Sequence, residues 1–197
     1  MKVPITNSLK SKVFAALLAA GVAGPSAYVA TELTLPSEGF LTHLHLDPVG
    51  LPTTCIGHLV QKGETPKQTY TEDECITKFV KDWKIAENSV HRYVKVPFRT
   101  EWMEGALVDF TLNKGSGNFS KSTLLKDLNR GNYDQACIAL TNWVYATHNG
   151  QKVKLPGLVI RATKQYKYCM GEEPAGYKQT MILWEQQNKE SNNGYSR

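Results

Sequence analysis

The strongest constraint on the fold is the stretch from Thr71 to Val94, which reads as one long amphipathic helix. Thr71 and Glu74 have the spacing of a capping box, in which each side chain bonds the backbone N–H of the other residue. Pro97 ends the pattern, because proline cannot continue a helical hydrogen-bond ladder. Apolar residues follow at helical spacing, namely Ile76, Phe79, Val80, Trp83, Ala86, Val90 and Tyr93. A helix of this length can join two halves of a domain.

The chain of 197 residues is long enough for one domain with a core, or for one domain plus an appendage. Its formal charge of +5 would favour an anionic polymer such as a bacterial wall. Lys and Arg are spread along the chain without a basic, aromatic-rich cluster, so we expect no nucleic-acid partner. The Gly-rich stretch 113–118 lacks P-loop spacing and a preceding strand. We therefore expect no cofactor.

Glu38, Asp47 and Thr53 lie in a stretch whose turn-forming residues can bring two carboxylates to face each other across a cleft. Glycoside hydrolysis needs such a pair, one protonated to give a proton to the leaving oxygen and one ionised. For an arbitrary Glu and Asp, the alternative is that both are solvated loop charges. The spacing of these three residues is what argues against that alternative.

The segment from Glu38 to His58 resembles the catalytic segment of the phage-type lysozymes, glycoside hydrolase family 24. The pattern is Glu-Gly, eight residues between the Glu and the Asp, five between the Asp and the Thr, and then Ile-Gly-His. The series from Asp109 to Arg161 resembles the C-terminal lobe of the same family. The resemblance implies an α+β, mostly α, lysozyme-like two-lobe fold. It would have a small β-hairpin lobe, a long connecting helix and a helical C-terminal lobe.

The resemblance also implies an activity. A member of this family is a muramidase that hydrolyses the β-1,4 bond between N-acetylmuramic acid and N-acetylglucosamine in peptidoglycan, and so lyses the host cell. Glu38 would be the general acid, placed at the start of the first lobe helix. Asp47 and Thr53 would position a water on the opposite face of the sugar and invert the anomeric centre. The protein would be a monomer.

Other residues are expected to have structural roles. His58 and Asp82, on the long helix, are predicted to form a buried ion pair, and Arg161 is also assigned to the structure. The four cysteines have no CxxC spacing, so a zinc site is not expected. Two disulfides would suit an exported chain, with three possible pairings. The chain order and the fold implied by the resemblance favour Cys55–Cys75 and Cys137–Cys169.

The N-terminal residues have the charge layout of an export signal. Lys2, Lys10 and Lys12 precede residues 13–30, which carry no charge and include seven Ala and two Gly. As one helix, these 18 residues would span about 27 Å, just short of a bilayer core. The alternatives are a cleavable signal peptide, with a mediocre cleavage site at 21–23, and a buried core helix.

Such a weakly apolar, Ala- and Gly-rich segment resembles the N-terminus of the signal-arrest-release endolysins of lambdoid phages. The resemblance implies that residues 1–31 first tether an inactive enzyme to the inner membrane and then release it into the periplasm. This segment holds no cysteine, so release would act by repositioning the stretch around Glu38. The muramidase domain would occupy residues 32–170, and residues 171–197 are expected to be a partly mobile extension.

A few residues depart from the family pattern. His45 stands where an aromatic residue is common, Pro52 where a larger one is usual, and Ala162 where a second Arg is frequent. None of these changes removes a catalytic group. Two other functions stay open: a lytic transglycosylase, which cleaves the same bond with one Glu and no water, and a catalytically silent wall-binding protein.

Overall fold

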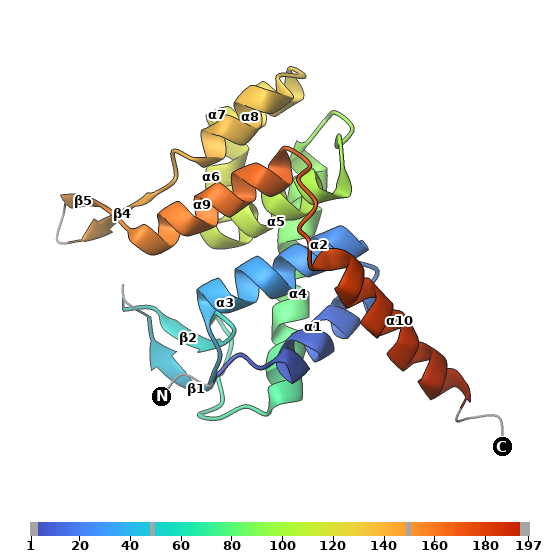
Figure 1. Cartoon of the computed structure of the whole chain (residues 1–197). Helices are drawn as coiled ribbons and strands as arrows, with labels where there is room; N and C mark the ends of the chain where they lie inside the picture. The colour runs from blue at the N-terminus through green and yellow to red at the C-terminus, as the bar shows by residue number, and fades with distance from the viewer. Residues whose placement is uncertain (1–3, 48–49, 149–150, 194–197) are drawn as a thin grey trace.

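The computed structural model of the protein describes residues 4–47, 50–148 and 151–193, and it is mostly helical with two small sheets (Figure 1). The helices before the long one are α1 (Asn7–Ala19), α2 (Gly24–Val29), the π-helical turn η1 (Ala30–Thr34) and α3 (Leu35–Glu38). The later ones are α4 (Glu72–Tyr93), α5 (Glu101–Lys114), α6 (Ser116–Lys121), α7 (Thr123–Asn129), α8 (Tyr133–Leu140), α9 (Pro156–Cys169) and α10 (Tyr177–Asn193). The strands are β1 (Leu41–Leu46), β2 (Pro52–Cys55), β3 (His58–Leu59), β4 (Tyr145–His148) and β5 (Gln151–Lys154).

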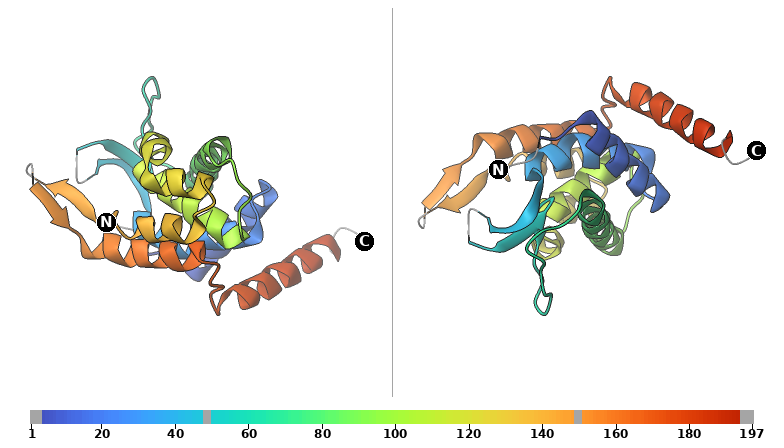
Figure 2. Two further views of the ribbon diagram at one scale, coloured as in Figure 1. Left: turned by 90° about the horizontal axis from the view of Figure 1, so that it is seen from above. Right: turned by 90° about the horizontal axis from the view of Figure 1, so that it is seen from below.

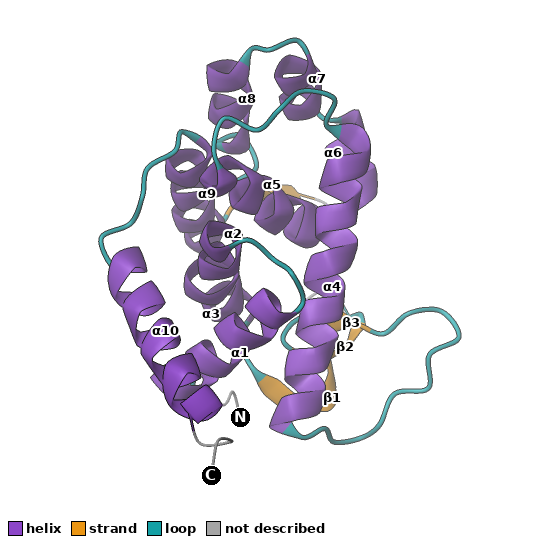
Figure 3. Ribbon diagram, turned by 90° about the vertical axis from the view of Figure 1, so that its right-hand side faces the viewer, coloured by secondary structure: helices purple, strands orange, loops and turns teal. Residues whose placement is uncertain are grey.

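The long helix α4 begins and ends where the sequence predicts. Thr71 accepts a hydrogen bond from the N–H of Glu74, and the Glu74 side chain accepts one from the N–H of Thr71. The apolar face of α4 is buried, with Phe79, Trp83 and Val90 almost fully covered. Figure 3 shows α4 running from the small sheet to the helices of the other lobe. The expected lysozyme-like, mostly helical α+β fold is therefore found.

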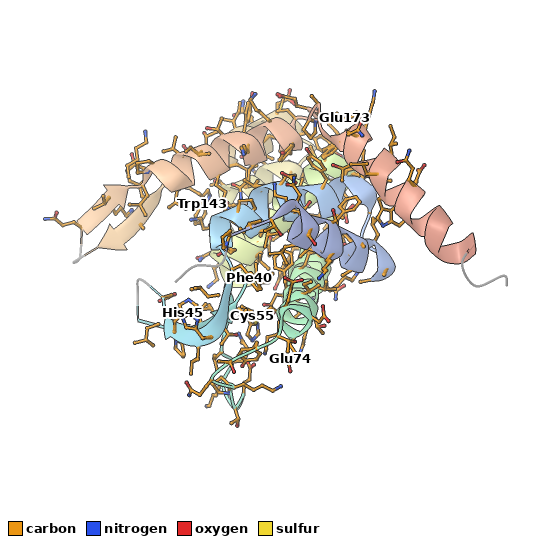
Figure 4. The ribbon with its side chains drawn as sticks, turned by 60° about the horizontal axis from the view of Figure 1, so that its bottom comes forward. Phe40, His45, Cys55, Glu74, Trp143 and Glu173 are labelled. Carbon is orange, nitrogen blue, oxygen red and sulfur yellow. A yellow bond between two sulfur atoms is a disulfide. The ribbon has the colours of Figure 1, made fainter. Side chains whose placement is uncertain are left out.

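The small lobe is an antiparallel sheet in the order β1–β2–β3. His45 on β1 pairs with Thr53 on β2, and a register irregularity lies between Leu41 and His45. A disulfide joins Cys55, at the end of β2, to Cys75 in the first turn of α4. Cys55 is labelled in Figure 4, between the sheet and α4. This bond ties the sheet to the long helix, and it is the pairing that the family resemblance implied.

The N-terminal segment is folded into the core as two helices. In this structure residues 13–30 do not form one helix, because α1 ends in a Schellman motif: Val22 N–H bonds Leu17 O, and Gly21 has a φ of +78°. Buried residues of α1 belong to the main hydrophobic core, among them Val13, Phe14 and Leu17. None of the helices in the described part of the chain is long and apolar enough to cross a bilayer.

Helix α2 packs very closely against α5. A Cβ atom at Gly105 of α5 would lie 3.0 Å from the Cα of Ser26 and 3.1 Å from a methyl group of Val29. Ala27 and Ala30 are fully buried in the same contact region. The small residues of this segment therefore allow two helix backbones to approach each other at the centre of the molecule.

The helix that begins with α2 continues through η1 to Glu38. Pro36 has no N–H for the carbonyl of Glu32, and the turn just before it is π-helical, with Leu35 N–H bonded to Ala30 O. Gly39, with a φ of +78°, ends the helix. Glu38 is thus the last residue of a helix, and its expected place at the start of one is wrong.

Two elements were not predicted. β4 and β5 form a hairpin that projects from the helical lobe beside the start of α9 (Figures 1 and 2). Helix α10 forms in the segment expected to be a tail; its first turns lie against α2, and the rest runs away from the body. Tyr177, Met181 and Trp184 give α10 one apolar face, and all three pack against the core. The second disulfide, Cys137–Cys169, joins α8 to the end of α9.

We predict that Phe14→Ala lowers the free energy of unfolding by about 3–5 kcal/mol, because it leaves a large cavity in the core. Phe14 is only 2% exposed. Urea unfolding followed by circular dichroism would measure the change, with the exposed Ser11→Ala on the same helix as the control. Equal stability of Phe14→Ala and the wild type would mean that α1 is not part of the core.

Candidate active site

A cleft with a volume of about 1370 Å³ separates the small sheet from the helices of the other lobe. Its walls come from the three strands of the small sheet, one side of α4 and the end of α5. Glu38, Asp47, Thr53 and His58 all line it. The structure therefore brings the three predicted catalytic residues to one cavity.

Glu38 is held from two sides. Its Oε1 accepts a hydrogen bond of 2.7 Å from the guanidinium of Arg161 on α9. On the other side lies Gly57, between β2 and β3, where a Cβ atom would be 2.9 Å from Glu38 Oε2. Gly57 also has a φ of +66°, which other residues rarely adopt. Glycine is thus needed here both for its backbone and for the space that it leaves to Glu38.

Arg161 in turn is held by Asp109, a fully buried carboxylate on α5. Nε and the second terminal nitrogen of Arg161 donate to the two oxygens of Asp109, at 3.0 and 2.7 Å. Thr34 and Gln165 donate two more hydrogen bonds to Asp109, at 2.6 and 2.7 Å. Burial opposes the charge of Arg161, but Asp109 and Glu38 outweigh it and raise the pKa of Arg161 above its usual value.

Asp47 and Thr53 are connected through the backbone of Leu51. Asp47 Oδ1 accepts from the N–H of Leu51 at 2.8 Å, and the N–H of Asp47 bonds the Leu51 carbonyl at 2.9 Å. The hydroxyl of Thr53, which is buried, donates to the same carbonyl at 3.1 Å. The turn between β1 and β2 thus fixes the acid and the hydroxyl on the same side of the cleft.

His58 lies where β3 meets α4, between two carboxylates. Nδ1 lies 2.7 Å from Asp82, its predicted partner, and Nε2 lies 3.0 Å from Glu64. The hydrogen bond to Asp82 and the one to Glu64 raise the pKa of His58, against burial and the charge of Lys78. Lys78, with Gln61 N–H and His58, lowers the pKa of Glu64 to about 2. These contacts join the small sheet to α4.

Sequence reasoning gave no role to Asp109, Gly57 or Glu64. The signal for Asp109 was a lone acid inside the apolar run from Ala106 to Phe110, which must find a buried partner. Gly57 belongs to the Ile-Gly-His pattern, but its contact with Glu38 depends on how the sheet folds onto α3. Within the described residues, no group of three or more His, Cys, Asp or Glu side chains is placed to hold a metal ion.

A cleft between a small sheet and a helical lobe, with an anchored Glu on one side and an Asp on the other, defines a lysozyme-like glycosidase. The phage lysozyme family model matches residues 36–165. The SAR-endolysin of Bacteriophage PS119 is 38% identical over 133 residues, which cover 68% of this chain and 76% of that protein. The SAR-endolysin of Enterobacteria phage P21 is 35% identical over 159 residues, or 78% and 93% of the two chains.

Solved structures agree. The endolysin from Escherichia coli O157:H7 phage FAHEc1 superposes with a TM-score of 0.65 at 26% identity, covering 72% of this chain and 90% of that one. The active form of the P1 phage endolysin Lyz gives a TM-score of 0.67 at 22% identity, over 86% and 95% of the two chains, which shows a shared fold. The chain belongs to the phage lysozyme family. The expectation of a phage endolysin with a lysozyme fold is confirmed.

We predict that the contribution of His58 to stability depends on pH. Its raised pKa means that the stabilisation is complete below about pH 6.5, the ordinary value, and is lost as the pH rises through the higher value of the folded state. Glu64, with a pKa of about 2, stays ionised over this range. The difference in unfolding free energy between the wild type and His58→Gln should therefore shrink from pH 5.5 to about pH 9. A constant difference would mean that His58 is bound in its neutral form.

We also predict a strong coupling between Arg161 and Asp109. Arg161→Met should lower the free energy of unfolding by about 3–5 kcal/mol, because it leaves a buried charge without its partner. Adding Asp109→Asn should restore most of that loss, since the amide is neutral, its oxygen accepts from Thr34, and its NH2 group donates to the Gln165 carbonyl once the Gln165 amide turns over. Urea unfolding of the two single variants and the double variant gives the coupling energy. Additive effects would contradict the ion pair.

Proposed function

We propose that Glu38, Asp47 and Thr53 hydrolyse the β-1,4 bond between N-acetylmuramic acid and N-acetylglucosamine in peptidoglycan. Glu38 donates its proton to the glycosidic oxygen while Asp47 takes a proton from a water that attacks the anomeric carbon from the opposite face. Thr53 positions that water. The bond opens with inversion and leaves a reducing end.

The observation that carries this proposal is the asymmetric support of Glu38. Arg161 donates to Oε1 of Glu38, while its other two donors bond the two oxygens of Asp109. In the proposed mechanism, Oε2 carries the proton that Glu38 gives to the glycosidic oxygen. Asp47 and Thr53 lie across the cleft, both bonded to the backbone of Leu51, where an ionised acid and a hydroxyl can hold a water between them.

The arrangement of the site supports the two other functions less well. A lytic transglycosylase uses one carboxyl and no water, so Asp47 and Thr53 would have no role in it. A silent wall-binding protein would not need Glu38 held by two partners beside a glycine that makes room for it.

We further propose that residues 1–31 first tether the protein to the bacterial inner membrane and that the released monomer acts in the periplasm. The Lys residues before an uncharged run and the SAR-endolysin relatives support this order of events. The core packing of α1 and α2 would then represent the released state. Two disulfides fit an exported protein.

Glu38→Gln should reduce peptidoglycan hydrolysis by about 10²- to 10⁴-fold, the loss expected for a general acid, without unfolding the protein. Thr53→Ala should cost less, about tenfold, because only one hydrogen bond to the water is lost. Mass spectrometry of digested peptidoglycan measures both, with the exposed Glu185→Gln as the control. We expect hydrated, reducing muropeptides from the wild type.

Three results would contradict this assignment. Full activity of Glu38→Gln would remove the general acid. Anhydro products from the wild type would identify a transglycosylase and leave Asp47 without a role. No cleavage by a folded wild type would indicate a binding protein.

A further inference from the structure

Helix α10 lies beyond the family match, which ends at residue 165, and it docks on α2, part of the N-terminal segment. On the basis of the membrane release proposed above, we propose that α10 is the docking element for the chain's own N-terminal segment. It binds residues 7–29 once they have left the membrane and keeps them in the folded enzyme. Figure 3 shows α10 on the same side of the molecule as α1 and α2.

The contact is built from two glycine–tyrosine pairs that face in opposite directions. A Cβ atom at Gly24 of α2 would lie 2.6 Å from the Tyr177 hydroxyl of α10. A Cβ atom at Gly176, just before α10, would lie 2.8 Å from the Tyr28 hydroxyl of α2. Each segment thus leaves room for the tyrosine of the other. A reciprocal fit of this kind selects one docked position.

Aromatic rings close the contact. Tyr177 meets Tyr28 edge-on at 5.5 Å and meets Trp102 of α5 edge-on at 4.8 Å. Trp102 stacks on Tyr168 of α9 at 5.8 Å, next to Cys169 and its disulfide. Edge-on aromatic pairs stabilise beyond the area they bury. The ring of Tyr177 is thus held between the N-terminal segment and the rigid end of the helical lobe.

The docking surface exists only when the N-terminal segment is folded in. Tyr28 and Gly24 belong to α2, whereas Trp102 and Tyr168 belong to the helical lobe. A segment inserted in a membrane cannot present its half of the contact to α10. A contact made in one state and absent from the other shifts the equilibrium toward the first. α10 therefore favours the released, active arrangement.

A steric block and its rescue test this role in the full chain. Gly24→Ala should push Tyr177 out, since its methyl group meets the hydroxyl oxygen. Tyr177→Phe removes that oxygen, and the next ring atom lies at an ordinary 3.6 Å. The double variant should therefore dock again, although its N-terminal segment is as apolar as that of Gly24→Ala. Tyr177→Phe alone and the exposed Gln179→Ala are the controls.

Two measurements apply to every variant. Hydrogen exchange of the purified chain should be about tenfold faster for residues 7–29 in Gly24→Ala than in the wild type, the double variant and the controls. After expression, Gly24→Ala should also stay longer in the membrane fraction, and the double variant should leave it like the wild type.

The outcomes separate this role from the proposed function. If the wild type enters and leaves membranes but Gly24→Ala behaves identically in both measurements, the tether stands and the role of α10 is wrong. If the double variant is not rescued, Gly24→Ala acts through α2 itself and the role is again wrong. A wild type that never fractionates with membranes overturns both the tether and this role, whereas the Glu38→Gln digest is unaffected.

Discussion

One guanidinium group connects the helices that meet at the cleft. Arg161 of α9 bonds Asp109 of α5 on one side and Glu38, at the end of α3, on the other. An arginine suits this position because its planar group can bond two carboxylates at once and stays charged when buried. The buried pair alone is weak support for stability, since two desolvated charges offset much of their own attraction. What it supplies is position: Glu38 lies at a fixed point relative to two helices that come from distant parts of the chain.

The other side of the cleft is fixed by independent means. A disulfide joins Cys55 to α4, and His58 bonds Asp82 on the same helix. The sheet that carries Thr53 is therefore attached to α4 at two points. The two walls of the cleft are held by different interactions. Helix α4 connects the small sheet on one side with the helical lobe on the other (Figure 3). A cleft of this construction can hold two carboxylates, Glu38 and Asp47, at a set separation while the strands themselves remain short.

Local signals in the sequence allowed the prediction of α4, whereas the small sheet and the residues that line the cleft were predicted from the family resemblance. The capping box at Thr71 depends on residues three apart, and the partner of His58 follows from the face of one helix. Contacts between distant elements were not predictable in this way. Asp109 meets its partner Arg161 only when α9 folds over α5. Helix α10 was missed because only three of its apolar residues, Tyr177, Met181 and Trp184, pack against the core, and most of the segment is polar.

Two features were missed for physical reasons of the same kind. Residues 13–30 carry no charge, so their hydropathy is compatible with one helix, whereas in this structure the Schellman motif at Gly21 divides them. The hairpin β4–β5 was overlooked although Asn149-Gly150, a common hairpin dipeptide, stands between its strands in the sequence. In both cases a glycine in the sequence was the local signal for a break or a turn. The catalytic roles of Glu38, Asp47 and Thr53 remain predictions that rest on the family pattern and on the geometry of the cleft.

The close approach of α2 and α5 sets an upper limit on the hydrophobicity of the N-terminus. A Cβ atom at Gly105 would already lie only 3.0 Å from the Cα of Ser26, so a leucine or phenylalanine at this contact would force the helices apart. Substitutions that make this segment more hydrophobic would therefore be tolerated only at positions that face away from α5. Under the proposed membrane tether, the alanine and glycine of residues 13–30 would have to suit two environments, lipid and a narrow protein interior.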